Sequence, residues 1–513
     1  MKPVRLVRGF FTVGGWTLMS RILGFLRDAW IAAVLGTGPA AQAFIVAFSL
    51  PNMFRRFFAE GAFNTAFVPM FSKKLESGEG AESFAQEAMA GLATVVLALT
   101  LLVQLFMPAL VWAMASGFDP EKFDLSVTYG RIAFPYILFI SLAALASGVL
   151  NATGRFAAAA AAPVLLNVTF IAALWAVPRM GWDAGLALTW AIPVAGLAQL
   201  ALVWWAARRA GISLIPRRPR LSPDMKRLAL VAAPAMLAGG VVQINLLVGR
   251  QVSSYFSEAM AWLYNADRLY QLPLGVVAIA IGVVLLPDLS RRLQAQDMGG
   301  ARHSFNRATE FALALTLPAA VALVVIATPL TSVLFERGRF GPADTVGTAL
   351  AVAVYGLGLP AFVLQKVLQP LFFAREDTRR PFHYALVSMG VNAVLAMGLA
   401  PVIGYIAAAL ATTLAGWAMV VQLWLGSRAM GESVRLDDGL RARAPRIAAA
   451  SAFMGLCLWL GALALGPVLH MAAWRYLALA ALVVLGMVSY FGSGALFGAF
   501  RLSDFRAAVR RRG

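Results

Sequence analysis

Cysteine, histidine and charge are all scarce in this chain. A single cysteine in 513 residues excludes an intramolecular disulfide framework and a cysteine-based metal site. The three histidines are scattered and do not indicate a metal site either. Charged residues make up 13% of the chain against 60% hydrophobic residues, and a soluble domain could not bury that much apolar surface. The composition therefore predicts an all-α polytopic membrane protein.

Chemistry-bearing motifs are also absent. The sequence contains no Walker loop, so we do not expect ATP to drive its activity. Nothing indicates covalent catalysis, a catalytic residue or a cofactor. We therefore expect a protein that is not an enzyme.

Polar breaks divide the chain into about fourteen apolar stretches, each long enough for a helix across roughly 30 Å of hydrocarbon. Twelve or thirteen spans are the alternative, and no connection between the stretches resembles a soluble domain. The predicted spans are residues 10–35, 40–71, 84–115, 126–150, 157–178, 184–207, 225–256, 258–290, 304–334, 344–373, 381–402, 404–427, 445–466 and 472–499.

Basic residues outside these stretches predict the orientation. If the N-terminus is cytoplasmic, thirty of the 43 Lys and Arg residues lie in inner segments and five in outer segments. Both termini are then cytoplasmic. This placement explains the formal net charge of +19 without nucleic acid as a partner. The basic N-terminus resembles a signal peptide, but Arg21, Arg27 and Asp28 in the first span predict a retained helix.

Two blocks of six spans echo each other. The sequence Val-Pro-Met-Phe-Ser-Lys-Lys-Leu at 68–75 matches Leu-Pro-Asp-Leu-Ser-Arg-Arg-Leu at 286–293, and Pro135 matches Pro360. Prolines and basic residues at the ends of spans recur in any membrane protein, and this recurrence can explain a single match. It explains an ordered set of matches less well. We predict two parallel, pseudo-symmetric lobes and a final helix pair. Their boundaries are 1–222 for the first lobe, 223–441 for the second and 442–513 for the pair.

Two connections in this scheme are long and basic. Residues 208–227 form a proline-broken linker between the blocks, and residues 428–446 precede the last two spans. We expect the basic residues of 428–446 to contact anionic lipid headgroups.

Cations lie where bare charge is costly, inside the apolar stretches. A charge in hydrocarbon usually faces a cavity, a partner or a substrate. The eight cations are Arg21, Arg27, Arg55, Arg56, Arg131, Arg250, Arg268 and Lys366, against only three carboxylates at comparable depth, Asp28, Glu60 and Asp267. This surplus favours an anionic substrate, because arginine forks suit phosphate and carboxylate oxygens.

Four of these cations are the ones that we expect to line a hydrated cavity and meet the substrate: Arg21, Arg27, Arg55 and Arg268. The other charges have structural alternatives. Arg56 can pair with Glu60 one turn later, and Asp28 and Asp267 can orient neighbouring arginines. Arg131 and Arg250 can reach the membrane surface with their long side chains. Lys366 fits a structural role and a place in the substrate cavity equally well. Ser20 lies beside Arg21, and Gly24 allows close approach of another backbone or a ligand.

The stretches that carry these charges resemble the MurJ (MviN) family of lipid II flippases. They are Ser-Arg-Ile-Leu-Gly-Phe-Leu-Arg-Asp at 20–28, Leu-Pro-Asn-Met-Phe-Arg-Arg-Phe-Phe-Ala-Glu-Gly-Ala-Phe at 50–63, Ala-Asp-Arg-Leu-Tyr-Gln-Leu-Pro-Leu-Gly at 266–275 and Phe-Phe-Ala-Arg-Glu-Asp-Thr at 372–378. The resemblance runs from the first span to the last.

The resemblance implies a fold of the multidrug/oligosaccharidyl-lipid/polysaccharide exporter superfamily, in which the last two helices form a groove for a polyprenyl tail. It implies that Arg21, Arg27 and Arg268 bind the diphosphate and sugar headgroup of lipid II, with Arg55, Asp28 and Glu60 around the same cavity. It also implies alternating access in the bacterial cytoplasmic membrane. We expect a monomer, with enzymes of cell-wall synthesis as candidate partners.

Two departures from the family bear on mechanism. Some relatives carry an acidic residue at the position that Gln42 occupies here. We therefore do not expect a carboxylate to act at the outer entrance of this chain. Some resemble sodium-coupled carriers, yet residues 228–257 and 378–431 contain no Asp or Glu. A hard cation prefers oxygen ligands that include carboxylates. Our hypothesis is that the membrane potential, not sodium, drives the cycle.

Other functions remain open from the residues alone. A flippase for another polyprenyl-diphosphate oligosaccharide would use a similar cationic site. A drug or cation antiporter of the same superfamily should instead place isolated carboxylates in its cavity. A membrane-embedded glycosyltransferase should carry acidic motifs in large outer loops, whereas the predicted outer loops are short.

Overall fold

The computed structural model describes residues 6–58, 62–78 and 80–499. Within these residues every regular element is a helix, and the one β-bridge is an isolated pair, Arg337 and Phe340. The all-α prediction is confirmed. It follows from the solvent, because a helix satisfies its own backbone polar groups where hydrocarbon cannot.

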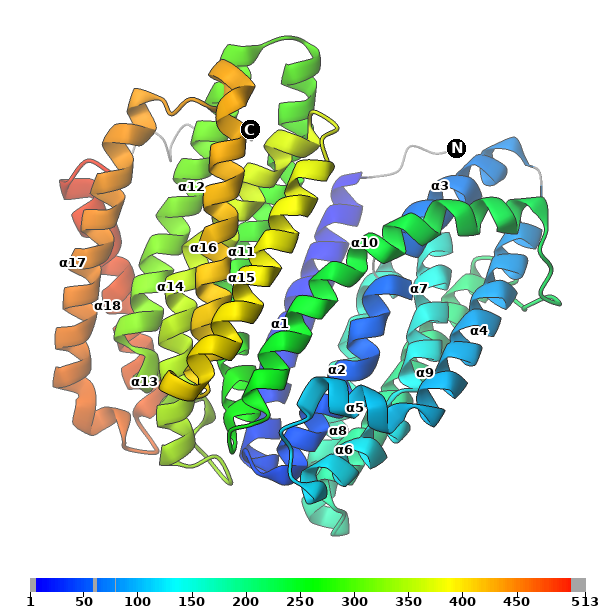
Figure 1. The fold of residues 1–513 in the computed structure, drawn as a ribbon, viewed down its shortest axis with the longest axis horizontal. Helices are drawn as coiled ribbons and strands as arrows, with labels where there is room; N and C mark the ends of the chain where they lie inside the picture. The colour runs from blue at the N-terminus through cyan, green and yellow to red at the C-terminus, as the bar shows by residue number, and fades with distance from the viewer. Residues whose placement is uncertain (1–5, 59–61, 79, 500–513) are drawn as a thin grey trace. The chain divides into compact units, whose positions relative to one another are not determined.

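The chain divides into two compact units, each described here by itself. The first is Met1–Ala261 with the loop Arg337–Phe340, and the second is Trp262–Glu336 with Gly341–Gly513. The helices of the first unit are α1 (Leu6–Leu35), α2 (Pro39–Phe58), α3 (Ala62–Ser77), α4 (Ala81–Leu105), α5 (Met107–Ala115), α6 (Pro120–Ala133), α7 (Tyr136–Ala152), α8 (Phe156–Met180), α9 (Ala184–Arg209) and α10 (Pro223–Ser253) (Figure 1).

The second unit contains the remaining helices. They are α11 (Ala259–Gln294), which begins just before the boundary, α12 (Met298–Val325), α13 (Ala327–Phe335), α14 (Pro342–Phe373), α15 (Arg379–Ile403), α16 (Ile406–Ser427), the short 3₁₀ segment η1 (Arg428–Val434), α17 (Asp438–Leu469) and α18 (Arg475–Leu496).

An aromatic core organises the first unit. Phe170 of α8 packs edge-on against Phe44 and Phe48 of α2, with ring centroids 6.0 and 5.7 Å apart. All three rings are buried, as is Tyr136 of α7 in the same cluster. Because α8 also lies along α1, this core places two aromatic rings beside the charged part of α1.

Helix α10 packs within the first unit, although it begins the second sequence block. It contacts α3 and α5. Beyond its end, the Ser254 hydroxyl oxygen accepts a hydrogen bond of 3.0 Å from the Gly117 N–H, in the turn after α5. A Cβ at Gly117 would lie 2.7 Å from the Tyr255 nitrogen, so glycine is required for this approach. The predicted lobe boundary at residue 222 stays a prediction. In the structure, α10 packs with helices that precede the linker.

The C-terminal helices are fastened to α12 in the second unit. Helix α17 packs against both α12 and α18, and buried Met454, Leu458 and Tyr490 form a cluster with Ile326. The Tyr490 hydroxyl donates to the Ala314 carbonyl oxygen at 2.6 Å. The predicted tail-binding role of this pair stays a prediction.

Ten helical segments in the described part of the chain are long and apolar enough to cross a membrane. They coincide with ten of the fourteen predicted spans. The other four predicted spans fall on α1, α2 with α3, α10 and α11, which contain most of the intramembrane charges. Fourteen spans and cytoplasmic termini therefore stay predictions, whereas a multi-pass membrane protein is established.

Matched helix breaks support the internal repeat. Helix α4 is interrupted at Phe106 and α12 at Ile326, the residue after each helix, and each break is followed by a nine-residue helix, α5 or α13. The two breaks lie 220 residues apart, close to the sequence offset of the repeat. The proline match behaves differently: Pro135 separates α6 from α7, whereas Pro360 lies inside the continuous helix α14.

Candidate functional site

Arg27 is the most deeply buried of the described intramembrane cations, with 7% of the residue exposed. Its Nε and Nη2 both donate to Oδ1 of the adjacent Asp28, at 2.9 and 2.7 Å. Asp28 is itself 4% exposed. This contact agrees with the predicted structural role of Asp28 in orienting a neighbouring arginine, while a substrate role for either residue stays a prediction.

Asn167 of α8 is the third member of the site, and sequence reasoning missed it. Its Oδ1 accepts from Nη1 of Arg27 at 2.9 Å, and its Nδ2 donates to the Ser20 carbonyl oxygen at 2.8 Å. The same Nδ2 lies 3.3 Å from the Ser20 hydroxyl oxygen. One amide thus bridges two turns of α1. The sequence did contain a signal for it: Asn167 is a polar residue within the apolar run of α8, and a polar side chain in such a run needs hydrogen-bond partners.

Gly24 of α1 faces the amide of Asn167 on α8. A Cβ added at Gly24 would lie 3.6 Å from Oδ1 of Asn167, which is ordinary van der Waals contact, so this approach does not require glycine. Residues 20, 24, 27 and 28 follow helical spacing and share one face of α1. The group that faces Gly24 is the Asn167 side chain, and the predicted close approach of another backbone or a ligand stays a prediction.

Two aromatic rings complete the surroundings of Arg27. The guanidinium carbon lies 5.7 Å from the ring centroid of Phe48 and 5.4 Å from that of Phe170. A cation over such faces is attracted by the ring quadrupole. Ser20, Arg27, Asp28 and Asn167 are called the Arg27 cluster below. It presents a desolvated guanidinium in one orientation.

The other predicted residues of the first unit are more accessible. Arg21 and Arg56 are exposed, and Arg55 is half-buried. Glu60 lies outside the described residues, so its predicted pairing with Arg56 is untested. Gln42 is fully buried, and its Nε2 donates to the Thr37 carbonyl oxygen at 3.1 Å.

Arg268 belongs to the second unit. Its guanidinium carbon lies 4.4 Å from the ring centroid of Tyr264, one turn earlier on α11. Asp267 accepts a hydrogen bond from the side-chain amide of Gln271. Both charges are half-buried, whereas Lys366 on α14 is exposed. The structure thus assigns the predicted headgroup residues to two units, with Arg27 and Arg268 each stabilised within its own.

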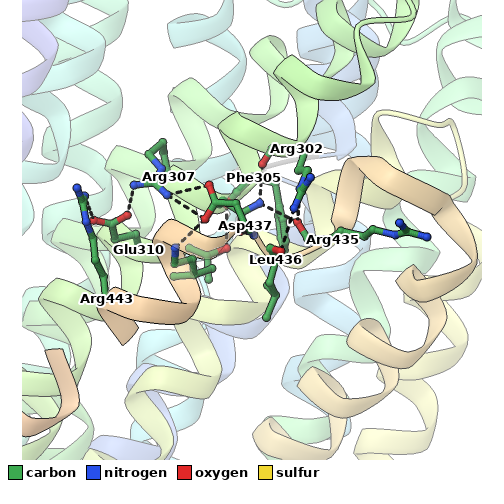
Figure 2. A network of polar contacts seen from close by, with 11 residues as sticks. Arg302, Phe305, Arg307, Glu310, Arg435, Leu436, Asp437 and Arg443 are labelled. Atoms are coloured by element: carbon green, nitrogen blue, oxygen red, sulfur yellow. Dashed lines mark hydrogen bonds and ion pairs between the residues drawn. The ribbon is translucent and has the colours of Figure 1, made fainter. Parts of the chain in front are cut away.

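A larger polar network lies where α12 meets the start of α17 (Figure 2). Nη2 of Arg307 is 2.9 Å from Oδ2 of Asp437, and its Nη1 contacts Glu310. Arg443 reaches the other oxygen of Glu310 at 2.6 Å. Arg302 donates to the carbonyl oxygens of Arg435 and Leu436 at 3.2 and 3.1 Å. These contacts are called the Arg307 network below.

This network includes basic residues of the segment 428–446. The guanidinium of Arg443, one basic residue of this segment, pairs with Glu310 and so fastens α17 to α12, while lipid contact by the segment stays a prediction. Asp437 caps α17 by accepting from the Leu440 N–H at 2.6 Å. Although burial opposes it, this bond and the Arg307 charge hold the pKa of the Asp437 carboxyl below its usual value.

A family model described as "Lipid II flippase MurJ" matches residues 31–485, most of the chain. The chain belongs to the MurJ family. A Rhizobium meliloti (strain 1021) protein named "Probable lipid II flippase MurJ" is 47% identical over 99% of this chain and 96% of its own length. A Burkholderia cenocepacia protein named "Lipid II flippase MurJ" is 35% identical over 89% and 90%.

Solved structures extend the likeness to the fold. A MurJ family structure titled "Lipid II flippase MurJ, inward closed conformation" has a TM-score of 0.79 and 24% identity, over 94% of this chain and 98% of that one. An inward-facing multidrug resistance MATE family transporter of the MOP superfamily has a TM-score of 0.68 and 14% identity, over 81% and 95%. The MurJ family fold predicted from sequence is confirmed, and the MATE family transporter shares that fold.

Proposed function

We propose that this chain moves lipid II, an undecaprenyl-diphosphate-linked disaccharide-peptide, from the inner to the outer leaflet of the bacterial cytoplasmic membrane. Membership of the MurJ family supports the substrate, and the apolar helices support the setting. The lipid is moved unchanged, so the chain acts as a transporter and not as an enzyme. We expect it to act as a monomer beside enzymes that make and consume lipid II.

The Arg27 cluster carries the residue-level proposal. A diphosphate that crosses hydrocarbon needs cationic partners in place of water. The guanidinium of Arg27 is already desolvated and oriented by Asp28 and Asn167, so binding an anion requires little further ordering. Its bonds to these two residues use three of five N–H donors. We infer that the others donate to phosphate oxygens.

Asp28 gives this cluster a second property. Its carboxylate offsets the Arg27 charge while the site is empty, so an isolated cation need not be buried. An arriving diphosphate would compete with Asp28 for the same guanidinium. We propose that this exchange makes headgroup binding reversible, which alternating access requires.

The remaining cations would contribute at other points of the substrate's path. Arg21 and Arg55 are the proposed accessory ligands in the first unit, with Ser20 as a hydroxyl partner and Glu60 and Arg56 nearby in sequence. Arg268 is the proposed headgroup ligand of the second unit, with Asp267 and Lys366 as secondary candidates. Membrane potential acting on the moving charges is worth about 2.3 kcal/mol per charge per 100 mV.

Lipid II flipping in proteoliposomes tests the proposal. We expect Arg27→Ala to slow flipping by on the order of ten- to a hundredfold, the factor that charge-assisted hydrogen bonds of about 1.5–3 kcal/mol represent. Arg179→Ala, an exposed arginine at the end of α8, is the matched control and should flip normally. Wild-type rates in Arg27→Ala would overturn the role of the Arg27 cluster.

The same vesicles test the coupling and the substrate. An imposed potential, negative on the cytoplasmic side, should change the flipping rate when sodium is equal on both sides. A requirement for a sodium gradient independent of voltage would contradict the proposed energy source. Transport of another polyprenyl-diphosphate oligosaccharide with no transport of lipid II would contradict the proposed substrate.

A further inference from the structure

A separate apolar cavity of about 430 Å³ lies within the first unit, where α4, the 210–222 linker and α10 meet. Buried Leu92, Met225 and Leu228 line it, together with the exposed Leu221. Its volume is typical of small-molecule sites. Gly91 also lines it, and a Cβ added there would meet no atom within 4 Å, so the cavity has real space at this helix surface.

The linker that forms one wall is held in place by polar contacts to α4. The Ser213 carbonyl oxygen accepts from Nε2 of Gln86 at 3.0 Å, and the Ser222 hydroxyl donates to Oε2 of Glu87 at 2.8 Å. Between these contacts, Pro219, Arg220 and Leu221 line the cavity. Because both ends of this segment are bonded to one helix, the cavity wall is preformed.

The charge at the cavity is positive. Among the described residues that line it, Arg220 carries the only charge. The neighbouring sequence adds the exposed basic residues Arg217, Arg218, Lys226 and Arg227, while the nearby Asp224 is paired with Lys74 at 2.9 Å. A ligand that matches this site has an apolar body and an anionic end.

We propose that this cavity binds one acyl chain of an anionic phospholipid, with its phosphate held by Arg220. The predicted topology places the linker on the cytoplasmic side, where such lipids surround a basic segment. An acyl chain fits the lining, in which Thr94 is the other polar side chain and its hydroxyl already donates to the Ala90 carbonyl oxygen. The bound lipid would fill the space between α4 and the first turns of α10. The site is distinct from the Arg27 cluster.

Photolabelling tests this site directly. The full-length chain would be placed in phosphatidylcholine nanodiscs that contain a phosphatidylglycerol with a diazirine near the end of one acyl chain. We expect labels on residues 88–95 and 225–233. Arg220→Gln should lower this labelling about fivefold, the worth of one basic residue near anionic lipid. Arg218→Gln, exposed in the same linker but not lining the cavity, is the matched control.

A second variant tests the cavity itself. Gly91→Leu fills the space without a clash at Cβ and should abolish labelling at both segments. Gly398→Leu, at an equally open glycine on α15, should leave it unchanged. Equal labelling by a phosphatidylcholine probe, or labelling insensitive to Gly91→Leu, would overturn the proposal. Displacement of the probe by a polyprenyl diphosphate would overturn the phospholipid assignment. None of these measurements requires transport, so their failure would leave the proposed function untouched.

Discussion

The Arg27 cluster and the Arg307 network use the same chemistry to different effect. In the network, two guanidiniums share two carboxylates and a third donates to backbone carbonyl oxygens, and the side chains of these ion pairs remain 15–32% exposed. In the cluster, one guanidinium holds one carboxylate and one amide, with both charged residues under 10% exposed. Electrostatic contacts are stronger where water is excluded, and surface ion pairs are worth little. Burial, and not the number of charges, separates the candidate site from a structural fastening.

The largest difference between the two regions should appear when the charged side chains of each are replaced and lipid II flipping is measured. Arg27→Ala alone leaves Asp28 buried without its cation, which costs about 3–5 kcal/mol of stability. The double variant Arg27→Met/Asp28→Leu removes that penalty, so we expect near-normal thermal stability but flipping still reduced on the order of ten- to a hundredfold. Normal flipping in the stable double variant would make the cluster purely structural.

The network should respond in the opposite way. Asp437→Ala removes the cap of α17 and the partner of Arg307, so we expect a loss of about 1–2 kcal/mol in stability with unchanged flipping per folded molecule. The readout is the midpoint of thermal unfolding, compared with Asp437→Ser, which keeps a capping oxygen and should recover about half of the loss. Slower flipping by fully folded Asp437→Ala would give the network a role in transport.

Asn167 tests whether orientation of Arg27 matters beyond its charge. Asn167→Ala keeps Arg27 and Asp28 but removes the bridge to Ser20, so we expect flipping to fall about fivefold, as for one hydrogen bond of about 1 kcal/mol. Asn167→Asp, which can still accept from Arg27, should retain more activity. Two equal, wild-type-like rates would show that Asp28 alone orients the guanidinium.

The smallest expected effect is a pH dependence of the network's contribution to stability. The folded pKa of Asp437 is lower than its ordinary value of 3.8, so its stabilising contribution is complete above that value. It is lost as the pH falls through the folded pKa, because the carboxylate is then protonated. Unfolding midpoints of the wild type and Asp437→Ser should therefore converge at acid pH, and a constant gap would contradict this assignment.

Much of the fold was predictable, because hydrocarbon permits few choices. Long apolar runs demand helices, and ten predicted spans coincide with helices that meet length and hydropathy criteria. The break at Pro135 was less predictable, because proline can sit inside a helix, as Pro360 does, when neighbouring groups satisfy the freed carbonyl.

The candidate site was predicted only in part. Arg27 and Asp28 stood out as charges in an apolar run, but which groups they contact depends on the packing of α8 across α1. Asn167 lies 140 residues from Arg27, a distance that periodicity cannot bridge. Arg443 is a second example, because its partner Glu310 lies 133 residues away in sequence. Local sequence patterns identify charged residues that are costly to bury, whereas the tertiary structure determines which residues they contact.

The placement of α10 bears on how the gene could be divided. A split at the basic linker, where the sequence repeat ends, would separate α10 from α3 and α5, which it contacts. A split in the turn around Ser257, next to the boundary at Ala261, would leave that packing intact in one polypeptide. We therefore expect coexpressed halves divided near Ser257 to be recovered from detergent extracts in higher yield than halves divided in the basic linker.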